Sequence, residues 1–199
     1  MYKIVGIAGS PRKNQSTDKL VQYALNCAKE HVSEIETEFI SLAGKKFNGC
    51  LACNWCRDNF GCTLKDDVTD ILENLKDDNI KGIIVGSPVY MGSMTAQTKA
   101  FLDRTVFFRR NKFHFKHKVG GALTVGGSRH GGQDLTLMNI HAAFMIHDMV
   151  IVPDSSPTSH FGGAAWSKIE QGTMKDHVAL ETVQNLGYNV ADVVKKLYL

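Results

Sequence analysis

Four of the five cysteines lie within one short stretch of the chain, at Cys50, Cys53, Cys56 and Cys62. A C-x2-C-x2-C-x5-C run of this kind places thiolates on one tight loop, where the sulfurs can turn inward around a centre that accepts four sulfur ligands. The spacing favours an iron–sulfur cluster with these four cysteines as its ligands. The fifth, Cys27, falls on the apolar stripe of a predicted helix, and we expect it to be a buried free thiol.

Other uses of the cysteines compete with a cluster. Structural zinc usually takes its ligands from two separated Cys or His pairs, and the run has no second pair downstream. Disulfides are not expected, because a chain of 199 residues is large enough to be stable without cross-links and shows no export signal. Zinc binding and free reactive thiols stay open as alternatives.

The composition indicates one ordinary domain spanning 1–199, because the chain is 43% hydrophobic and 22% charged. It starts with a short apolar run that leads straight into glycine, which fits neither a signal peptide nor a membrane span. We therefore expect a cytoplasmic protein that does not bind a membrane. The formal charge is +3 without a dense basic stripe, so we expect no nucleic-acid partner and interpret residues 109–118 as a solvated loop.

Short apolar runs alternate with segments of helical periodicity along most of the chain. Strands are predicted at 3–8, 37–42, 81–88, 119–125 and 149–152, and helices at 16–30, 68–76, 96–104, 133–145 and 176–197. Such alternation predicts an α/β fold, a doubly wound five-stranded parallel sheet with helices on both faces. The cysteine-rich loop, about 47–65, is then an insertion after the second strand. A C-terminal extension at about 155–199 carries a glycine-rich segment, 161–166, which we expect to be a flexible loop over a partner's site or over its own sheet.

Three of the predicted strands end in loops of small and polar residues, at 9–17, 88–94 and 126–133. Ligands of doubly wound sheets bind beyond the carboxyl ends of the strands, so these loops are expected to converge on one ligand. The first loop ends in Ser16-Thr17-Asp18, which is suitable helix N-cap chemistry and a suitable phosphate site, although hydroxyls here can also serve as a cap alone.

The missing motifs narrow the ligand class. The first loop lacks the G-x-G-x-x-G pattern of dinucleotide-binding folds and the G-x4-G-K-[ST] pattern of phosphate-loop nucleotidases. A mononucleotide remains, and Tyr90 and Met91 suit an aromatic ring system, which points to flavin mononucleotide (FMN). The candidate FMN-binding residues are Ser10, Arg12, Asn14, Ser16, Thr17, Pro88, Val89, Tyr90, Met91, Gly92, Gly127, Ser128 and Gly132.

Taken in order, these motifs resemble the iron–sulfur flavoproteins, a flavodoxin-like family related to the FMN reductases. The resemblance covers about residues 3–152. It is carried by the cysteine run and by Gly9-Ser-Pro-Arg-Lys-Asn, Ser16-Thr17, Lys65-Asp-Asp67, Gly86-Ser-Pro-Val-Tyr-Met-Gly92, Ala96-Gln-x-Lys-Ala100, Asp103-Arg104 and Gly131-Gly-Gln133. It implies a flavodoxin-like fold, non-covalent FMN, a 4Fe–4S cluster on the cysteine run, and a homodimer or a dimer of dimers.

The expected function is electron transfer between FMN and the cluster, with a ferredoxin-type carrier as partner. The main alternative is an NAD(P)H-dependent FMN or quinone reductase without a stable cluster, and a non-catalytic flavin-binding regulator is a third class. Within the run, Trp55 and Phe60 are expected either to shield a cluster from water or simply to pack. His130 is interpreted as an exposed loop histidine.

Overall fold

The computed structural model describes residues 1–168 and 172–199, and its strands form one parallel sheet. The strand order is β2-β1-β3-β4-β5, and β6 also pairs with β4. The strands are β1 (Tyr2–Ala8), β2 (Ile35–Ser41), β3 (Ile80–Pro88), β4 (Val119–Gly126), β5 (Val150–Ile151) and β6 (Gly163–Trp166). The predicted five-stranded doubly wound sheet is confirmed, and β6 is an addition to it.

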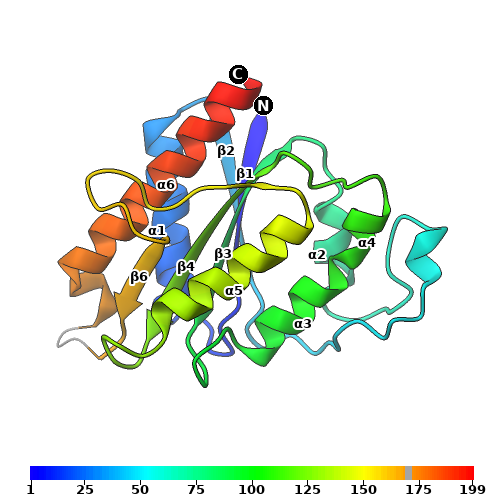
Figure 1. Cartoon of the computed structure of the whole chain (residues 1–199), viewed down its shortest axis with the longest axis horizontal. Helices are drawn as coiled ribbons and strands as arrows, with labels where there is room; N and C mark the ends of the chain where they lie inside the picture. The colour runs from blue at the N-terminus through cyan, green and yellow to red at the C-terminus, as the bar shows by residue number, and fades with distance from the viewer. Residues whose placement is uncertain (169–171) are drawn as a thin grey trace.

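Helices cover both faces of this sheet, as Figure 1 shows. One face packs against α1 (Ser16–His31) and α6 (His177–Tyr198). The other packs against α2 (Thr69–Asn74), α3 (Ala96–Arg104), α4 (Val106–Arg110) and α5 (Gln133–Ile146). Two short 3-10 turns, η1 (Trp55–Arg57) and η2 (Thr173–Lys175), lie in the connections. In the described ranges, no helix combines the length and hydropathy that crossing a bilayer requires.

The contact between α1 and α6 depends on a glycine. A Cβ placed on Gly187 of α6 would lie 2.4 Å from the carbonyl oxygen of Ala24 in α1. Real side chains essentially never approach a carbonyl so closely, so the two helices can pack at this distance only because residue 187 has no side chain. The close packing fixes α1, whose first turn points to the carboxyl edge of the sheet.

The strand order reverses between β1 and β3, because the chain moves outward from β1 to β2 and then crosses back to β3. The carboxyl ends of these neighbours are paired in register, Ala8 with Gly86. This reversal is the place where doubly wound sheets bind ligands. The loops that follow β1 and β3 therefore start side by side.

Two expectations about loops are wrong. Residues 109–118 are not simply a solvated loop, because Arg109 and Arg110 end helix α4 and the segment also contains the buried Phe115 and Lys118. Nor is 161–166 a loop: Gly163–Trp166 is strand β6, which extends the edge beside β4 beyond the two residues of β5. Within the predicted C-terminal extension, about 155–199, residues 169–171 lie outside the described residues.

Candidate functional site

A cavity of about 130 Å³ opens at the carboxyl edge, where the loops after β1, β3 and β4 meet. It brings together predicted FMN-binding residues from all three loops: Ser10, Arg12, Ser16, Thr17, Pro88, Val89, Tyr90 and Gly127. Sequence reasoning missed three further lining residues, Gln15, Val125 and Ser167. Ser167 directly follows β6, and its backbone N–H donates to the Gly126 carbonyl (2.9 Å), so the C-terminal extension supplies part of the wall.

Helix α1 begins at this cavity, and its end differs from the expected cap. Ser16 and Thr17 lie inside the first turn, whereas the N-cap residue is Gln15, whose side chain makes no capping hydrogen bond. The first N–H groups of a helix need an outside acceptor, and the positive end of the helix dipole favours an anion there. The hydroxyl of Ser16 also has a partner in the C-terminal extension, because Thr173 Oγ1 donates to Ser16 Oγ at 2.7 Å.

The loop after β1 is held by its own hydrogen bonds. The buried Ser10 accepts from the backbone N–H of Arg12 at 3.1 Å, and the N–H of Asn14 donates to Asp18 at 2.9 Å. The same Asp18 oxygen accepts from the hydroxyl of Ser41 at 3.1 Å. Asn14 is exposed, and the described lining of the cavity does not include it.

The loop after β3 makes a tight turn at the cavity mouth. Tyr90 and Ser93 exchange two backbone hydrogen bonds of 2.8 and 3.1 Å. Met91 and Gly92 form the tip with φ of 50° and 76°, and the Met91 side chain is fully exposed. Neither tip residue is part of the described cavity lining, so the turn presents Tyr90 to the cavity and Met91 to solvent.

The loop after β4 touches this turn through two glycines. At Gly132 (φ 99°) an added Cβ would lie 3.2 Å from the Cα of Gly92, so a side chain there would push the loops apart. The side chain of Gln133 braces the loop, donating to the Ser128 carbonyl at 2.6 Å and accepting from the Gly131 N–H at 2.9 Å. The expected cavity contacts Ser128 and Gly132 thus lie on this loop but outside the described cavity lining.

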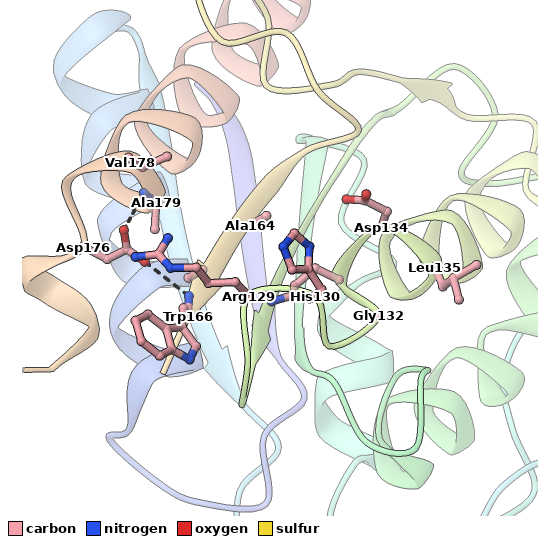
Figure 2. Close-up of a pocket in the computed structure, with 12 residues that line it drawn as sticks. Arg129, His130, Gly132, Asp134, Leu135, Ala164, Trp166, Asp176, Val178 and Ala179 are labelled. Carbon is pink, nitrogen blue, oxygen red and sulfur yellow. Dashed lines mark hydrogen bonds between the residues drawn. The ribbon is translucent and has the colours of Figure 1, made fainter. Parts of the chain in front are cut away.

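A neighbouring pocket of about 360 Å³ lies between this loop, β6 and the start of α6. Figure 2 shows Arg129 beside Trp166, with its guanidinium 4.7 Å from the ring centroid, and Asp176 accepting from backbone N–H groups. The Trp166 indole N–H donates to the carbonyl of Gly127, which lines the carboxyl-edge cavity, at 3.2 Å, so the two pockets adjoin. His130 is exposed here, as expected.

The cysteine run forms a second site, on the segment between β2 and α2 that stands out at the side of the molecule, cyan in Figure 1. All four cysteines of the run line one small pocket together with the side chains of Arg104 and Arg110. Cys56 is the most buried of the four, whereas Cys50 and Cys53 are exposed. Cys27 is buried in α1 on the other face of the sheet, where a free thiol was expected.

A zinc ion and an iron–sulfur cluster require different spacings of the cysteine sulfurs. In the part of the chain that the structure describes, no three His, Cys, Asp or Glu side chains converge closely enough to hold one. A zinc ion needs its sulfurs about 2.3 Å from a single point. Each iron of a 4Fe–4S cluster instead takes one cysteine at a different corner, so the sulfurs of such a site stand farther apart around one centre.

Arg104 binds both ends of the cysteine loop. Its side chain is fully buried and donates to the carbonyl of Asn48 (3.1 Å), the carboxylate of Asp66 (2.7 Å) and the carbonyl of Leu64 (3.4 Å). Burial acts to lower the pKa of Arg104, but the hydrogen bond to Asp66 and the charge of a Cys62 thiolate outweigh it and raise that pKa. The guanidinium therefore stays charged and joins both ends of the loop.

The end of α4 holds the middle of the loop. Arg110 Nη1 donates to the sulfur of Cys56 at 3.3 Å, and the amide of Asn111 donates to the carbonyls of Cys56 (3.3 Å) and Asn59 (3.4 Å). Phe60 packs edge-on against Phe107 and Phe108, so it belongs to an aromatic cluster, with 40% of its surface exposed. Sequence reasoning missed the role of Arg110, because no pattern links it to a cysteine 54 positions away.

A groove of about 700 Å³ runs between α3 and α5. Its lining includes Cys50 of the cysteine run and Ser93 and Met94 of the loop after β3. Apolar side chains such as Leu102 and Ile146 line it, and Ile146 is 61% exposed. The groove that touches both the cysteine run and the loop after β3 is therefore largely apolar.

His147 lies at this groove and is buried. Its Nε2 is 2.8 Å from the hydroxyl of Thr105, and Thr105 donates its own proton to the Leu102 carbonyl at 2.6 Å, so Nε2 of the histidine must carry the proton. Among the described residues, Nδ1 has no hydrogen-bond partner. Burial, assisted by the charge of Arg109, lowers the pKa of His147 to about 4.

Comparisons with known proteins identify the family of the chain. The model of the NADPH-dependent FMN reductase family matches residues 2–163. An iron–sulfur flavoprotein of Methanocaldococcus jannaschii is 47% identical over 97% of this chain and 97% of its own length. An iron–sulfur flavoprotein of Methanosarcina thermophila is 45% identical over 97% of this chain and 95% of its own.

Solved structures support the fold. A flavodoxin, WrbA-like protein from Agrobacterium tumefaciens superposes with a TM-score of 0.68 at 20% identity, covering 98% of this chain and 99% of the other. A flavodoxin from the domain Archaea gives a TM-score of 0.59 at 16% identity, covering 97% and 99%. With relatives this similar over almost their whole length, the chain belongs to the iron–sulfur flavoproteins, within the flavodoxin-like FMN reductase family.

Proposed function

We propose that the protein transfers electrons between FMN at the carboxyl edge and a 4Fe–4S cluster on Cys50, Cys53, Cys56 and Cys62, and exchanges them with a ferredoxin-type carrier. The family supports a flavin redox role. One observation carries the finer proposal: the four cysteines surround a single pocket with two guanidinium groups. When bound, FMN supplies one- and two-electron chemistry and the cluster supplies single-electron exchange.

The carboxyl-edge cavity fits the phosphate end of FMN. Whole ligands of drug size occupy pockets of about 300–1,000 Å³, and this cavity of about 130 Å³ can enclose only part of one. The uncapped N-terminus of α1 with Ser16 and Thr17 is suited to the phosphate. The ring would then lie at the open mouth, where Tyr90 is 47% exposed.

The cysteine pocket fits a cluster by charge as well as by sulfur count. Four thiolates around one centre concentrate negative charge, and a buried charge needs compensation. Arg104 and Arg110 supply two cations at this pocket.

The second candidate is an NAD(P)H-dependent FMN or quinone reductase without a stable cluster. The matching family model, described as NADPH-dependent FMN reductase, favours it. The two candidates differ in their reductant. NADPH should bleach bound flavin quickly in a reductase and only slowly in an electron-transfer protein that takes its electrons from a carrier.

Anaerobic purification with iron, sulfide, zinc and FMN counted per chain tests the proposal. We expect about four irons, four sulfides and one FMN. Replacing Cys53 with Ala should strip iron but leave flavin bound, whereas Cys27→Ala is the matched control that should keep both. Zinc in place of iron and sulfide, or full iron in Cys53→Ala, would contradict the cluster.

The surface around the cysteine run supports self-association into a homodimer or tetramer. Leu51 is 63% exposed and Trp55 is 44% exposed, and the groove from Cys50 to Met94 continues this apolar surface. Apolar groups gathered beside a cofactor usually need cover. We propose that in a symmetric dimer the cysteine pocket of one chain faces the flavin cavity of the other.

Mixing two disabled variants tests this arrangement. Cys53→Ala removes the cluster and Ser16→Asp weakens FMN binding, so at FMN concentrations below the raised dissociation constant neither parent dimer holds both cofactors. Transfer between chains predicts that mixed dimers recover electron transfer above both parents. Mixed dimers verified by mass that show no recovery would place the transfer within one chain.

A further inference from the structure

We propose that Arg110, acting through Cys56, raises the reduction potential of the cluster in the cysteine pocket, an inference that rests on the cluster assignment above. Arg110 is a positioning and charge-compensating residue in this role, because its contact is with the ligand sulfur. The electron-accepting step changes no covalent bond: an external reductant such as dithionite gives one electron to the cluster.

The contact is built by the fold. Arg110 ends helix α4, and Phe107 and Phe108 of this helix lie in the core with at most 1% of their surface exposed. That packing limits the movement of the helix end. The guanidinium donates to the Cys56 sulfur at 3.3 Å, and the following residue, Asn111, binds the Cys56 carbonyl at 3.3 Å. Two successive residues thus donate hydrogen bonds to the most buried cysteine of the run.

The two arginines of the pocket differ in their free charge. Arg104 lies 2.7 Å from the carboxylate of Asp66, which offsets its charge. Arg110 has no carboxylate within ion-pair distance in the described ranges, 1–168 and 172–199, so its charge acts on the pocket uncompensated. It is half-buried, which limits screening by solvent.

This geometry determines the direction of the effect. Adding an electron makes the cluster and its thiolates more negative by one charge. A cation and a hydrogen bond at a ligand sulfur stabilise that more negative form. Removing them should therefore lower the reduction potential.

The test is an EPR-monitored redox titration of the purified holoprotein with dithionite, together with iron and sulfide counts. Arg110→Gln removes the charge at similar size. We expect it to shift the redox equilibrium of the cluster toward the oxidised form about tenfold, which for a one-electron couple lowers the potential by about 59 mV. Arg110→Lys keeps the charge but loses the planar donor, so a smaller shift in the same direction is expected.

Arg57→Gln is the matched control. It removes the same charge from the cysteine run, but Arg57 is exposed and the described lining of the pocket does not include it. The reduction potential of the cluster in Arg57→Gln should stay at the wild-type value. A wild-type potential in Arg110→Gln with full iron would overturn the inference, as would an Arg57→Gln shift as large as that of Arg110→Gln.

Two further outcomes are also decisive. If Arg110→Gln does not retain iron, Arg110→Lys carries the test, and a potential at or above wild type in that variant overturns the inference. If the unaltered protein contains no iron and sulfide, the proposed function fails, and the inference with it.

Discussion

Ser16→Asp provides the sharpest test of the flavin site. Ser16 lies in the first turn of α1, half-buried in the cavity lining, and the hydroxyl of Thr173 donates to it. An aspartate at this position can accept the same hydrogen bond, so its carboxylate would be held at the uncapped helix end. It would occupy the anion site and repel the phosphate of FMN.

The magnitude follows from what is lost. A hydrogen bond to a charged group contributes about 1.5–3 kcal/mol. Since 1.4 kcal/mol corresponds to a factor of ten, the dissociation constant of FMN should rise roughly ten- to hundredfold. Riboflavin lacks the phosphate, and its affinity should change little. Flavin fluorescence titration with both ligands measures the difference.

Gln22→Asp is the control for this test, because it adds the same charge to an exposed position of α1, about 9 Å further along the helix. It should leave both affinities unchanged. Equal weakening of FMN and riboflavin by Ser16→Asp would refute the assignment of the phosphate to this helix end. A general loss of folding would show in the thermal transition of the apoprotein.

Three further predictions concern stability. Arg104→Met leaves the Asp66 carboxylate without its buried partner, so the free energy of unfolding in urea should fall by about 3–5 kcal/mol. Gly187→Ala places a methyl group 2.4 Å from the Ala24 carbonyl oxygen and should cost about 1–3 kcal/mol in the same assay. His147 has a pKa of about 4 in the folded protein against an ordinary 6.5, so the unfolded chain binds more protons between these values and stability should fall as the pH is lowered through that window. The loss reaches about 3 kcal/mol at 1.36 kcal/mol per pH unit, and His147→Gln should flatten it.

Each of these predictions has a control or a contradicting result. Lys99→Met breaks an exposed ion pair with Asp103 and should change stability by less than about 1 kcal/mol. A Cβ added at Gly49 would lie 3.7 Å from its nearest atoms, so Gly49→Ala should be tolerated. An Arg104→Met or Gly187→Ala protein as stable as the parent would contradict the corresponding contact. A pH profile unchanged in His147→Gln would assign the acid sensitivity to another group.

The sheet and the ligand edge could be predicted because local patterns encode them. Buried strands appear as apolar runs, and the loops at 9–17, 88–94 and 126–133 stand out by composition. Topology then requires that loops after neighbouring parallel strands share one edge. The cavity accordingly unites Ser10 and Ser16 with Tyr90, which follows them by more than 70 positions.

Details that depend on backbone geometry were not accessible in this way. Ser16-Thr17-Asp18 reads as an N-cap, but the helix begins one residue earlier than a cap at Ser16 would require. The small-residue segment at 163–166 resembles a loop, yet it pairs with β4, because glycine and alanine fit beside a strand whose far side α6 covers. Pairing of this kind is decided by the partner strand and not by the segment's own propensity.

The cysteine site shows where the limit lies. Its four cysteines can be grouped from sequence because one loop carries all four sulfurs, so spacing alone brings them to one pocket. The groups that set the environment of those sulfurs come from elsewhere: Arg104 reaches Asp66 across 38 positions and Arg110 reaches Cys56 across 54. Nothing in the local pattern distinguishes these arginines from Arg109, which turns away to the Ile146 carbonyl. The cysteine pocket is thus encoded locally, whereas its charge environment, and with it the reduction potential of the proposed cluster, is fixed only when α3 and α4 pack against the loop.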